Sequence, residues 1–429
     1  PPQKKNFLQK FIKEKGGANA NMTGLEDKYI IKNNKRLRYG YTTGSCAAGA
    51  TRGAARMLLS GEALSEVELQ TPKGITLNLQ LHDIIKGENY VSCAVQKDAG
   101  DDPDTTNGIL VYAKVEKISA EAAKNIIDNQ NTDSKKVIIH SSIILDGGVG
   151  VGRVTKPGLS QKVGEAAINP VPKAMILREA EEAAQEYDYE GYLKITISVP
   201  EGEEISKKTF NPRLGIMGGI SILGTSGIVE PMSERALIAS IQVEMKQHFC
   251  QGENYILVTP GNYGADYLRE HMTIPFENNI KCSNYVGETI DMAIDMGVKG
   301  ILFVAHIGKF VKVAAGIMNT HSHCADGRME VLSASAIRAG GTLECAREIL
   351  EAGTTDEALA VIDRYGILEE TMAIVMEKIQ FYLDHRSYEQ ILLGAVVFSN
   401  VYGLLGQTRD ALKLMEAIQE QADAKTDKL

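Results

Sequence analysis

The stretch Asn211-Pro-Arg-Leu-Gly-Ile-Met-Gly-Gly-Ile-Ser-Ile-Leu-Gly-Thr-Ser-Gly-Ile-Val-Glu-Pro-Met-Ser233 places five glycines between an apolar lead-in and a serine suited to cap a helix. Glycine permits turns with φ > 0 and lets backbone N–H groups approach a ligand closely. At the carboxyl edge of a strand, such a loop is typical of a site for a nucleotide-like small molecule. The spacing matches neither Gly-x-Gly-x-x-Gly nor the Walker pattern, so a glycine-rich packing corner is the alternative. The residues predicted to bind a cofactor here are Gly215, Gly218, Gly219, Gly224, Thr225, Ser226 and Gly227.

Beyond residue 200 the chain alternates between apolar strands and helices. Strands are expected at 214–217, 255–258 and 300–305, each followed by a loop and a helix. This alternation predicts a parallel, Rossmann-like sheet with ligand loops on one edge. In the second of these loops, Tyr263 could stack on adenine and Asn262 could hydrogen-bond to it, although a simple turn fits equally well.

The preceding residues have a different rhythm. Strands are expected at 66–70, 75–81, 90–95 and 108–115, before a helix at 120–128, which favours an α+β domain. The predicted fold is therefore an α+β N-terminal domain followed by an α/β Rossmann-like three-layer domain with a helical C-terminal region. The expected parts are an N-terminal extension (1–37), the α+β domain (38–200), the α/β cofactor-binding domain (201–380) and a C-terminal helical tail (381–429).

The totals exclude several classes of protein. With 429 residues, 44% hydrophobic and 24% charged, the chain has the composition of a soluble globular protein. A net charge of −9 argues against nucleic acid as the main partner. Six scattered cysteines without Cys-x-x-Cys spacing suit reduced thiols, so a cytoplasmic location is expected. No window approaches the ~18 to 20 apolar residues of a membrane span. The apolar residues of 391–405 suit a core, although a homo-oligomer surface remains an alternative.

Polar side chains are concentrated at three further places. Thr42, Thr43 and Ser45 can cap a helix, and the same N-terminus could receive a substrate carboxylate. In the run 98–104, closely spaced carboxylates repel one another, which makes Asp101 and Asp104 candidates for a general acid or base. A cation site and an Asx-type turn are the alternatives for this run.

His306 ends a predicted strand, where ligand-binding side chains emerge in open α/β sheets. It is the third catalytic candidate, as a proton shuttle, and a purely structural histidine is the alternative. The trio His321-Ser-His-Cys324 lacks the separated second pair of a structural zinc site, so no protein-bound metal is predicted.

Six blocks of this sequence resemble the cobalt-precorrin-5B (C-1)-methyltransferase family, CbiD. In chain order they are Gly40-Tyr-Thr-Thr-Gly-Ser-Cys-Ala-Ala, Lys97-Asp-Ala-Gly-Asp-Asp-Pro-Asp, Gly152-Arg-Val-Thr-Lys-Pro-Gly-Leu, Ala167-Ile-Asn-Pro-Val-Pro, Leu214-Gly-Ile-Met-Gly-Gly-Ile-Ser-Ile-Leu-Gly-Thr-Ser-Gly and His306-Ile-Gly-Lys-Phe-Val-Lys. The resemblance implies transfer of a methyl group from S-adenosylmethionine to C-1 of cobalt-precorrin-5B, giving cobalt-precorrin-6A in the oxygen-independent branch of cobalamin synthesis. It also implies that the cobalt belongs to the substrate, and contact between His306 and that cobalt is a further alternative.

The implied chemistry is an in-line displacement in which the electron-rich macrocycle is the nucleophile. The protein then needs no nucleophilic side chain and must align two substrates and exclude water. The acetate and propionate arms of the macrocycle require cationic partners, for which Arg153, Lys156 and Lys309 are predicted because glycines lie near each. Two other functions stay open: an ATP-dependent small-molecule kinase, suggested by the glycines of 147–152, and a non-catalytic tetrapyrrole carrier.

Overall fold

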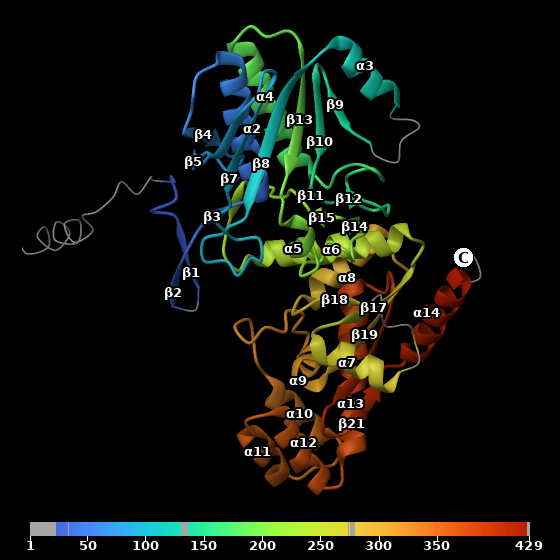
Figure 1. Cartoon of the computed structure of the whole chain (residues 1–429). Coiled ribbons are helices and arrows are strands. Elements are labelled where there is room, and N and C mark those ends of the chain that lie inside the picture. The colour runs from blue at the N-terminus through green and yellow to red at the C-terminus, as the bar shows by residue number, and fades with distance from the viewer. Residues whose placement is uncertain (1–22, 33, 130–135, 273, 275–278, 427–429) are drawn as a thin grey trace, which may run out of the picture. The chain divides into compact units, whose positions relative to one another are not determined.

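The computed structural model describes residues 23–32, 34–129, 136–272, 274 and 279–426 (Figure 1). Most of the predicted N-terminal extension, residues 1–22, lies outside the described residues. The chain divides into two compact units. Unit 1 runs to Lys156 and continues from Ser160 to Met232, and unit 2 consists of Pro157–Leu159 and the chain from Ser233 onward. Each unit has its own buried apolar core.

Unit 1 is built on a six-stranded sheet of order β6-β7-β8-β13-β10-β9. The strands are β6 (His82–Lys86), β7 (Tyr90–Gln96), β8 (Leu110–Ile118), β13 (Tyr192–Ser198), β10 (Ile143–Gly147) and β9 (Ile138–His140). Neighbours are antiparallel except β10 and β13, which are parallel. Along β13, buried and half-buried residues alternate, which gives the sheet one core face and one polar face.

Two helices, α2 (Thr43–Ser60) and α4 (Pro170–Glu186), pack on each other and cover the core face of this sheet (Figure 1). The sequence of α2 explains how closely it packs. Gly49 and Gly53 lie against Leu79 and Leu81, where an added Cβ would come within 2.5 Å of either side chain. Leu79 belongs to a hairpin of β4 (Glu66–Gln70) and β5 (Thr76–Gln80), and a second hairpin joins β1 (Tyr29–Lys32) to β2 (Lys35–Arg38). Helix α3 (Ala120–Asp128) completes the α+β unit.

The glycine-rich stretch 211–229 folds in unit 1, whereas the sequence assigned it to the second domain. Three short strand pairs tie it to earlier segments of the chain. They join β15 (Gly219–Ile220) to β11 (Gly150–Val151), β14 (Ile216–Met217) to β12 (Arg153–Val154), and β16 (Ile228–Val229) to β3 (Gly40–Tyr41). The expected strand at 214–217 is therefore not part of the second sheet, and helix α5 (Gly202–Ser206) packs beside β15.

Unit 2 contains a five-stranded sheet of order β18-β17-β19-β20-β21. The strands are β17 (Tyr255–Thr259), β18 (Ile280–Lys281), β19 (Gly300–His306), β20 (Leu392–Ser399) and β21 (Gly403–Gln407). The first four strands of the order are parallel and β21 is antiparallel to β20. Numbered along the chain, the order is 2-1-3-4-5, so the connections change direction between β17 and β19.

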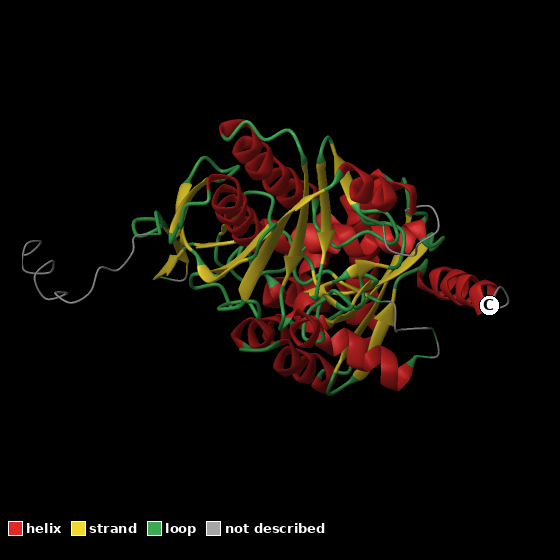
Figure 2. Ribbon diagram, turned by 45° about the horizontal axis from the view of Figure 1, so that its top comes forward, coloured by secondary structure: helices red, strands yellow, loops and turns green. Residues whose placement is uncertain are grey.

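Helices cover both faces of the second sheet. One face packs against α7 (Asn262–His271) and α14 (Ala411–Thr426), which ends beside the C mark in Figure 2. The other packs against α6 (Glu234–Cys250), α8 (Val286–Met296) and α13 (Leu368–Ser387). The remaining helices are α9 (Ile307–Phe310), η2 (Val311–Ala315), α10 (Arg328–Arg338), α11 (Leu343–Glu351) and α12 (Thr355–Arg364). This unit is mainly parallel α/β in three layers.

The C-terminal region is helical only in part, which corrects the expectation of a helical tail over 381–429. Within those residues, β20 lies between β19 and β21 in the sheet. Seven of its eight residues are buried, because it packs on both faces. Leu393, Val396 and Val397 belong to the core as expected, whereas Leu404 on the edge strand β21 is half exposed. Among the described residues, no helix is long and apolar enough to cross a membrane.

Candidate functional site

The carboxyl edge of the unit 2 sheet brings together several polar side chains. In an open sheet of order 2-1-3-4-5, ligands bind in the crevice beyond the strand ends, where the connections change direction. Here that point lies between β17 and β19. Asn262 and Tyr263 begin α7, the helix that follows β17. His306 is the last residue of β19, and Lys309 lies in α9 directly after it. These four residues were predicted from the sequence, and the fold places them at one sheet edge.

His306 caps helix α9 with its own ring. Its Nδ1 accepts a hydrogen bond from the Gly308 backbone N–H at 3.1 Å. A backbone N–H can only donate, so the neutral ring carries its proton on Nε2. Burial lowers the pKa of His306, while the nearby Asp356 carboxylate partly opposes the shift. In this geometry His306 offers an Nε2–H donor and has no free lone pair to take up a proton.

Lys309 is held against the neighbouring loop. Its Nζ donates to the Pro260 carbonyl at 2.9 Å. Burial lowers the pKa of Lys309; Cys282 opposes this shift and Lys312 adds to it. Lys312 is itself buried and donates to two backbone carbonyls. Lowered pKa values produced by burial, gathered at one sheet edge, are typical of functional sites.

In the loop after β17, the space beside Gly261 is not filled by other parts of the chain. At Gly261 an added Cβ would meet only one atom within 4 Å, Lys309 Nζ at 3.8 Å. No side chain caps the N-terminus of α7, so its first N–H groups are not satisfied by a cap. Tyr263 is 61% exposed, and its ring centroid lies 5.6 Å from that of His306. Asn262 Oδ1 accepts from Lys281 Nζ at 2.9 Å. This edge therefore offers the aromatic face of Tyr263, the backbone N–H donors at the start of α7, and the ammonium groups of Lys281 and Lys309.

Sequence reasoning missed Asp356. It lies at the start of α12 and accepts a hydrogen bond from Ser399 Oγ at 2.7 Å. Ser399 ends β20, so this carboxylate adjoins the same sheet edge as His306. The signal for this part of the edge was the polar residue Ser399 at the end of the apolar run of β20. Because that run was predicted to be helical, its end was not expected at a sheet edge.

The glycine-rich loop of unit 1 is largely closed by packing. An added Cβ would lie 2.2 Å from Gly150 O at Gly219, 2.4 Å from the Thr42 side chain at Gly224, and 2.9 Å from that of Thr71 at Gly227. Only Gly218, with φ +78°, has nothing within 4 Å. The loop's other predicted cofactor residues differ in environment. Gly215 packs on the Lys156 side chain, Ser226 Oγ donates to Ile228 O, and Thr225 is exposed.

The three predicted cap residues of α2 hold this loop. Thr42 Oγ1 accepts from Ser45 N at 3.2 Å, which is an N-cap bond. Thr43 Oγ1 accepts from Leu223 N at 2.9 Å, and Ser45 Oγ donates to Gly227 O at 2.7 Å. All three side chains are buried. The helix N-terminus thus receives the chain's own loop at the place where a substrate carboxylate was expected.

In the acidic run, Asp98, Asp101 and Asp104 each have a hydrogen-bond or ion-pair partner in the surrounding structure. Asp98 makes a bidentate pair with Arg38, and Asp101 accepts from the Arg38 backbone N–H at 2.5 Å. Asp104 pairs with the buried Lys97 at 2.6 Å. Burial raises the pKa of Asp104, but Lys97 and hydrogen bonds from Thr106 outweigh it, so the net pKa is below its usual value. Asp104 is therefore ionised at neutral pH and is not a proton donor there.

The remaining predicted cations also lie in unit 1. Arg153 pairs with Asp146 at 2.6 Å and donates to Gly147 O at 2.9 Å, so it braces β10 and its turn. Lys156 is exposed and lies along Gly215. Among the described residues, no group of three or more His, Cys, Asp or Glu side chains is placed to hold a metal ion.

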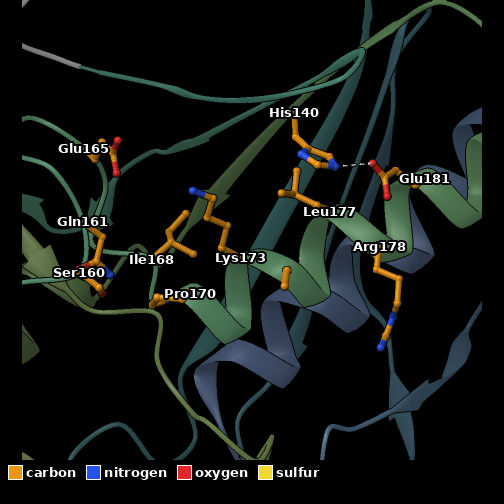
Figure 3. A pocket seen from close by; sticks show the side chains of 11 residues that line it. His140, Ser160, Gln161, Glu165, Ile168, Pro170, Lys173, Leu177, Arg178 and Glu181 are labelled. Carbon is orange, nitrogen blue, oxygen red and sulfur yellow. Dashed lines mark hydrogen bonds and ion pairs between the residues drawn. The ribbon is translucent and has the colours of Figure 1, made fainter.

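Unit 1 also contains a cavity of about 300 Å³, which the sequence did not predict (Figure 3). One wall is a face of α4, and the rest comes from β9 and from the loop preceding α4. Its lining residues are His140, Ser160, Gln161, Glu165, Ile168, Pro170, Lys173, Ala174, Leu177, Arg178 and Glu181. Nothing in the sequence marked it, because its walls combine β9 with the stretch 160–181, and only the fold brings these two segments together.

Comparison with known proteins finds the same family over both units. The CbiD family model matches residues 30–231, and that of the CbiD C-terminal domain matches residues 319–409. The cobalt-precorrin-5B C(1)-methyltransferase of Ruminiclostridium cellulolyticum is 48% identical over 87% of this chain and 92% of its own. That of Alkaliphilus metalliredigens is 44% identical over 92% and 98%. A crystal structure of cobalamin biosynthesis protein CbiD from Archaeoglobus fulgidus is 28% identical, with a TM-score of 0.36, over 70% of this chain and 87% of that one.

Proposed function

Because this chain belongs to the CbiD family, we infer that it is a cobalt-precorrin-5B C(1)-methyltransferase of cobalamin biosynthesis. The observation that carries this inference is the alignment with such methyltransferases over nearly the whole chain, including both units. The kinase and carrier hypotheses are rejected on the same ground.

We further propose that the methyl donor is S-adenosylmethionine and that it binds at the carboxyl edge of the unit 2 sheet. Gly261 and the uncapped start of α7 suit the close approach of a polar ligand. The exposed ring of Tyr263 suits adenine, and the carboxylate of Asp356 can accept from ribose hydroxyls. The ammonium of Lys309 can pair with the donor's carboxylate.

The reaction requires that the two substrates be aligned, and it needs no nucleophilic side chain from the protein. When a methyl group leaves a sulfonium, the C–S bond breaks with both electrons on sulfur, and π electrons of the macrocycle form the new C–C bond. The resulting positive charge on the macrocycle is lost when a proton leaves for solvent or a base. With its Nδ1 accepting from Gly308 N–H, the neutral His306 ring can donate from Nε2, so we assign it to orientation of an acceptor on either substrate.

The test is anaerobic incubation with cobalt-precorrin-5B and S-adenosylmethionine carrying a ¹³C-methyl group. The expected product is cobalt-precorrin-6A with the label at C-1, located by NMR. Calorimetry with S-adenosylhomocysteine tests the donor site separately. Absence of label from the macrocycle under conditions in which S-adenosylhomocysteine binds would contradict the assigned reaction. Absence of any binding would contradict the donor.

A further inference from the structure

We propose that the α4 cavity of unit 1 is a binding site for a carboxylate carried on a short aliphatic chain. Its α4 wall presents Pro170, Lys173, Ala174 and Leu177, spaced so that they lie on one face of the helix. Ile168 adds a further apolar side chain to this surface. Ser160, Gln161 and Glu165 form a polar wall opposite (Figure 3). A ligand that fits both walls has an apolar stem and a polar head.

Lys173 supplies the charge that selects the head group. Figure 3 shows its ammonium directed into the space between Glu165 and His140. Among the described residues, its Nζ has no hydrogen-bond or ion-pair partner, although its side chain is half-buried. The first turn of α4 contains no acidic residue that would cancel the positive end of the helix dipole. This positive end therefore adds to the positive potential of Lys173.

Two other ionisable groups of the lining, His140 and Arg178, already have carboxylate partners. His140 Nε2 lies 3.1 Å from Glu181 Oε1, and Glu165 accepts from the Lys162 backbone N–H at 3.2 Å. Arg178 pairs with Glu179 at 2.7 Å and points away from Lys173 in Figure 3. Among the described residues of the lining, Lys173 is the one cation without a carboxylate partner, and the Glu165 carboxylate keeps its charge because a backbone N–H does not neutralise it. One cation beside one anion suits a ligand with a single carboxylate better than a phosphate, which carries more negative charge.

The size of the cavity limits the ligand further. A volume of about 300 Å³ corresponds to roughly ten water molecules, so it holds on the order of ten non-hydrogen atoms. A macrocycle of four pyrrole-type rings is too large to enter, but a propionate or acetate arm with the adjoining ring edge fits. If the proposed function holds, the carboxylate is such an arm of cobalt-precorrin-5B. The other source of the same chemistry is a free short-chain carboxylic acid.

Two variants and one control separate these outcomes. Lys173→Met removes the charge and keeps the stem, and Ala174→Phe fills the cavity while keeping the charge. Lys162→Met removes an exposed lysine from the adjoining loop and leaves the lining intact. Sodium propionate is titrated into each protein and followed by saturation-transfer NMR, and KM for cobalt-precorrin-5B is measured anaerobically. Melting temperatures and S-adenosylhomocysteine affinities show whether each variant is folded and retains its donor site.

If the ligand is a macrocycle arm, KM for cobalt-precorrin-5B should rise about tenfold or more in Lys173→Met and Ala174→Phe. Their kcat values and S-adenosylhomocysteine affinities should stay unchanged. Lys162→Met should keep the KM of the wild-type protein. A free carboxylate predicts saturable propionate binding that both variants lose, without a change in KM. Either result supports the site, and the absence of both overturns it. Loss of S-adenosylhomocysteine affinity in Lys173→Met also overturns it, because the cavity would then belong to the donor. Propionate binding is measured without turnover, so it decides the site even if the wild-type protein transfers no methyl group.

Discussion

The glycine-rich loop of unit 1 and the loop after β17 in unit 2 use glycine for different purposes. In the first, the space beside Gly219 and Gly224 is filled by other parts of the same chain. In the second, the space beside Gly261 is open except for the Lys309 ammonium at 3.8 Å. Both loops follow apolar stretches and look alike as sequence. Glycine allows close approach of backbone to backbone as readily as of backbone to ligand.

The charged groups of the two regions also differ in what shifts their pKa values, which is cationic partners in unit 1 and burial in unit 2. In unit 1 the pKa values of Asp98 and Asp104 end below their usual range, because cationic partners outweigh the effect of burial. At the edge of the unit 2 sheet, burial lowers the pKa values of His306 and Lys309, so their charged forms are disfavoured. Partnered charges of the first kind hold a fold together, whereas groups desolvated at a strand end are available to a ligand.

The largest effect is expected where glycine serves packing. Gly219→Ala places a Cβ 2.2 Å from the Gly150 carbonyl oxygen, so the backbone must shift. We expect a loss of about 3–4 kcal/mol from the free energy of unfolding of unit 1, measured by urea titration. Gly218→Ala is the matched control: its φ of +78° is strained for alanine but its surroundings are open. It should cost only about 1 kcal/mol. Equal losses in the two variants would show that the loop is not packed as described.

The second prediction tests which loop binds the donor. Gly261 has an extended backbone with φ 174°, which any residue adopts, so Gly261→Val should leave the melting temperature unchanged. Its branched side chain should obstruct a ligand and weaken S-adenosylhomocysteine binding by about 10- to 100-fold, measured by calorimetry. Gly218→Ala, at the open position of the other loop, should bind normally. The reverse pattern would return the donor to the glycine-rich loop.

The sequence predicted some strands of this fold correctly, but it could not predict how the glycine-rich loop packs. Apolar runs such as 255–258 and 300–305 predicted parallel strands correctly, because strands buried on both faces are continuously apolar. The run of β20 was taken for helix, since a short apolar run has no periodicity that separates the two states. Its Val396 and Val397 favour a strand. The packing of Gly219 could not be predicted, because its neighbour Gly150 is distant in sequence.

The site residues divide in the same way. His306 ends a strand and Asn262 and Tyr263 come shortly after one, so the general rule for α/β sheets placed them at one edge. Asp356 was missed because it comes from a helix start and meets that edge only through Ser399. Thr43 fits a helix cap equally well as a structural group and as a substrate ligand, and the pattern alone does not distinguish the two roles.

Thr43 gives the third prediction. Thr43→Val removes the oxygen that accepts from Leu223 N–H and leaves that N–H without its partner. We expect a loss of about 1–2 kcal/mol in unfolding free energy with KM for cobalt-precorrin-5B unchanged. Thr43→Ser, which keeps the oxygen, is the control. If KM rose while stability stayed constant, Thr43 would instead be a substrate contact, as the sequence suggested.

The smallest effect concerns the proton of His306. Its pKa is lowered from about 6.5, so the neutral ring predominates above that value, and protonation as the pH falls through the folded pKa takes the Nδ1 lone pair from Gly308 N–H. The unfolded chain binds this proton first, so stability falls as the pH drops from about 6.5 to the folded pKa and is constant below it. We expect kcat/KM to be level above about pH 6.5 and to fall a few-fold as the pH drops through the folded pKa, which lies below that value. His306→Gln keeps a terminal N–H donor without titrating, so its profile should stay level over the same range. A decline that persists in His306→Gln would assign the titration to another group, and an unchanged wild-type profile would remove His306 from the reaction.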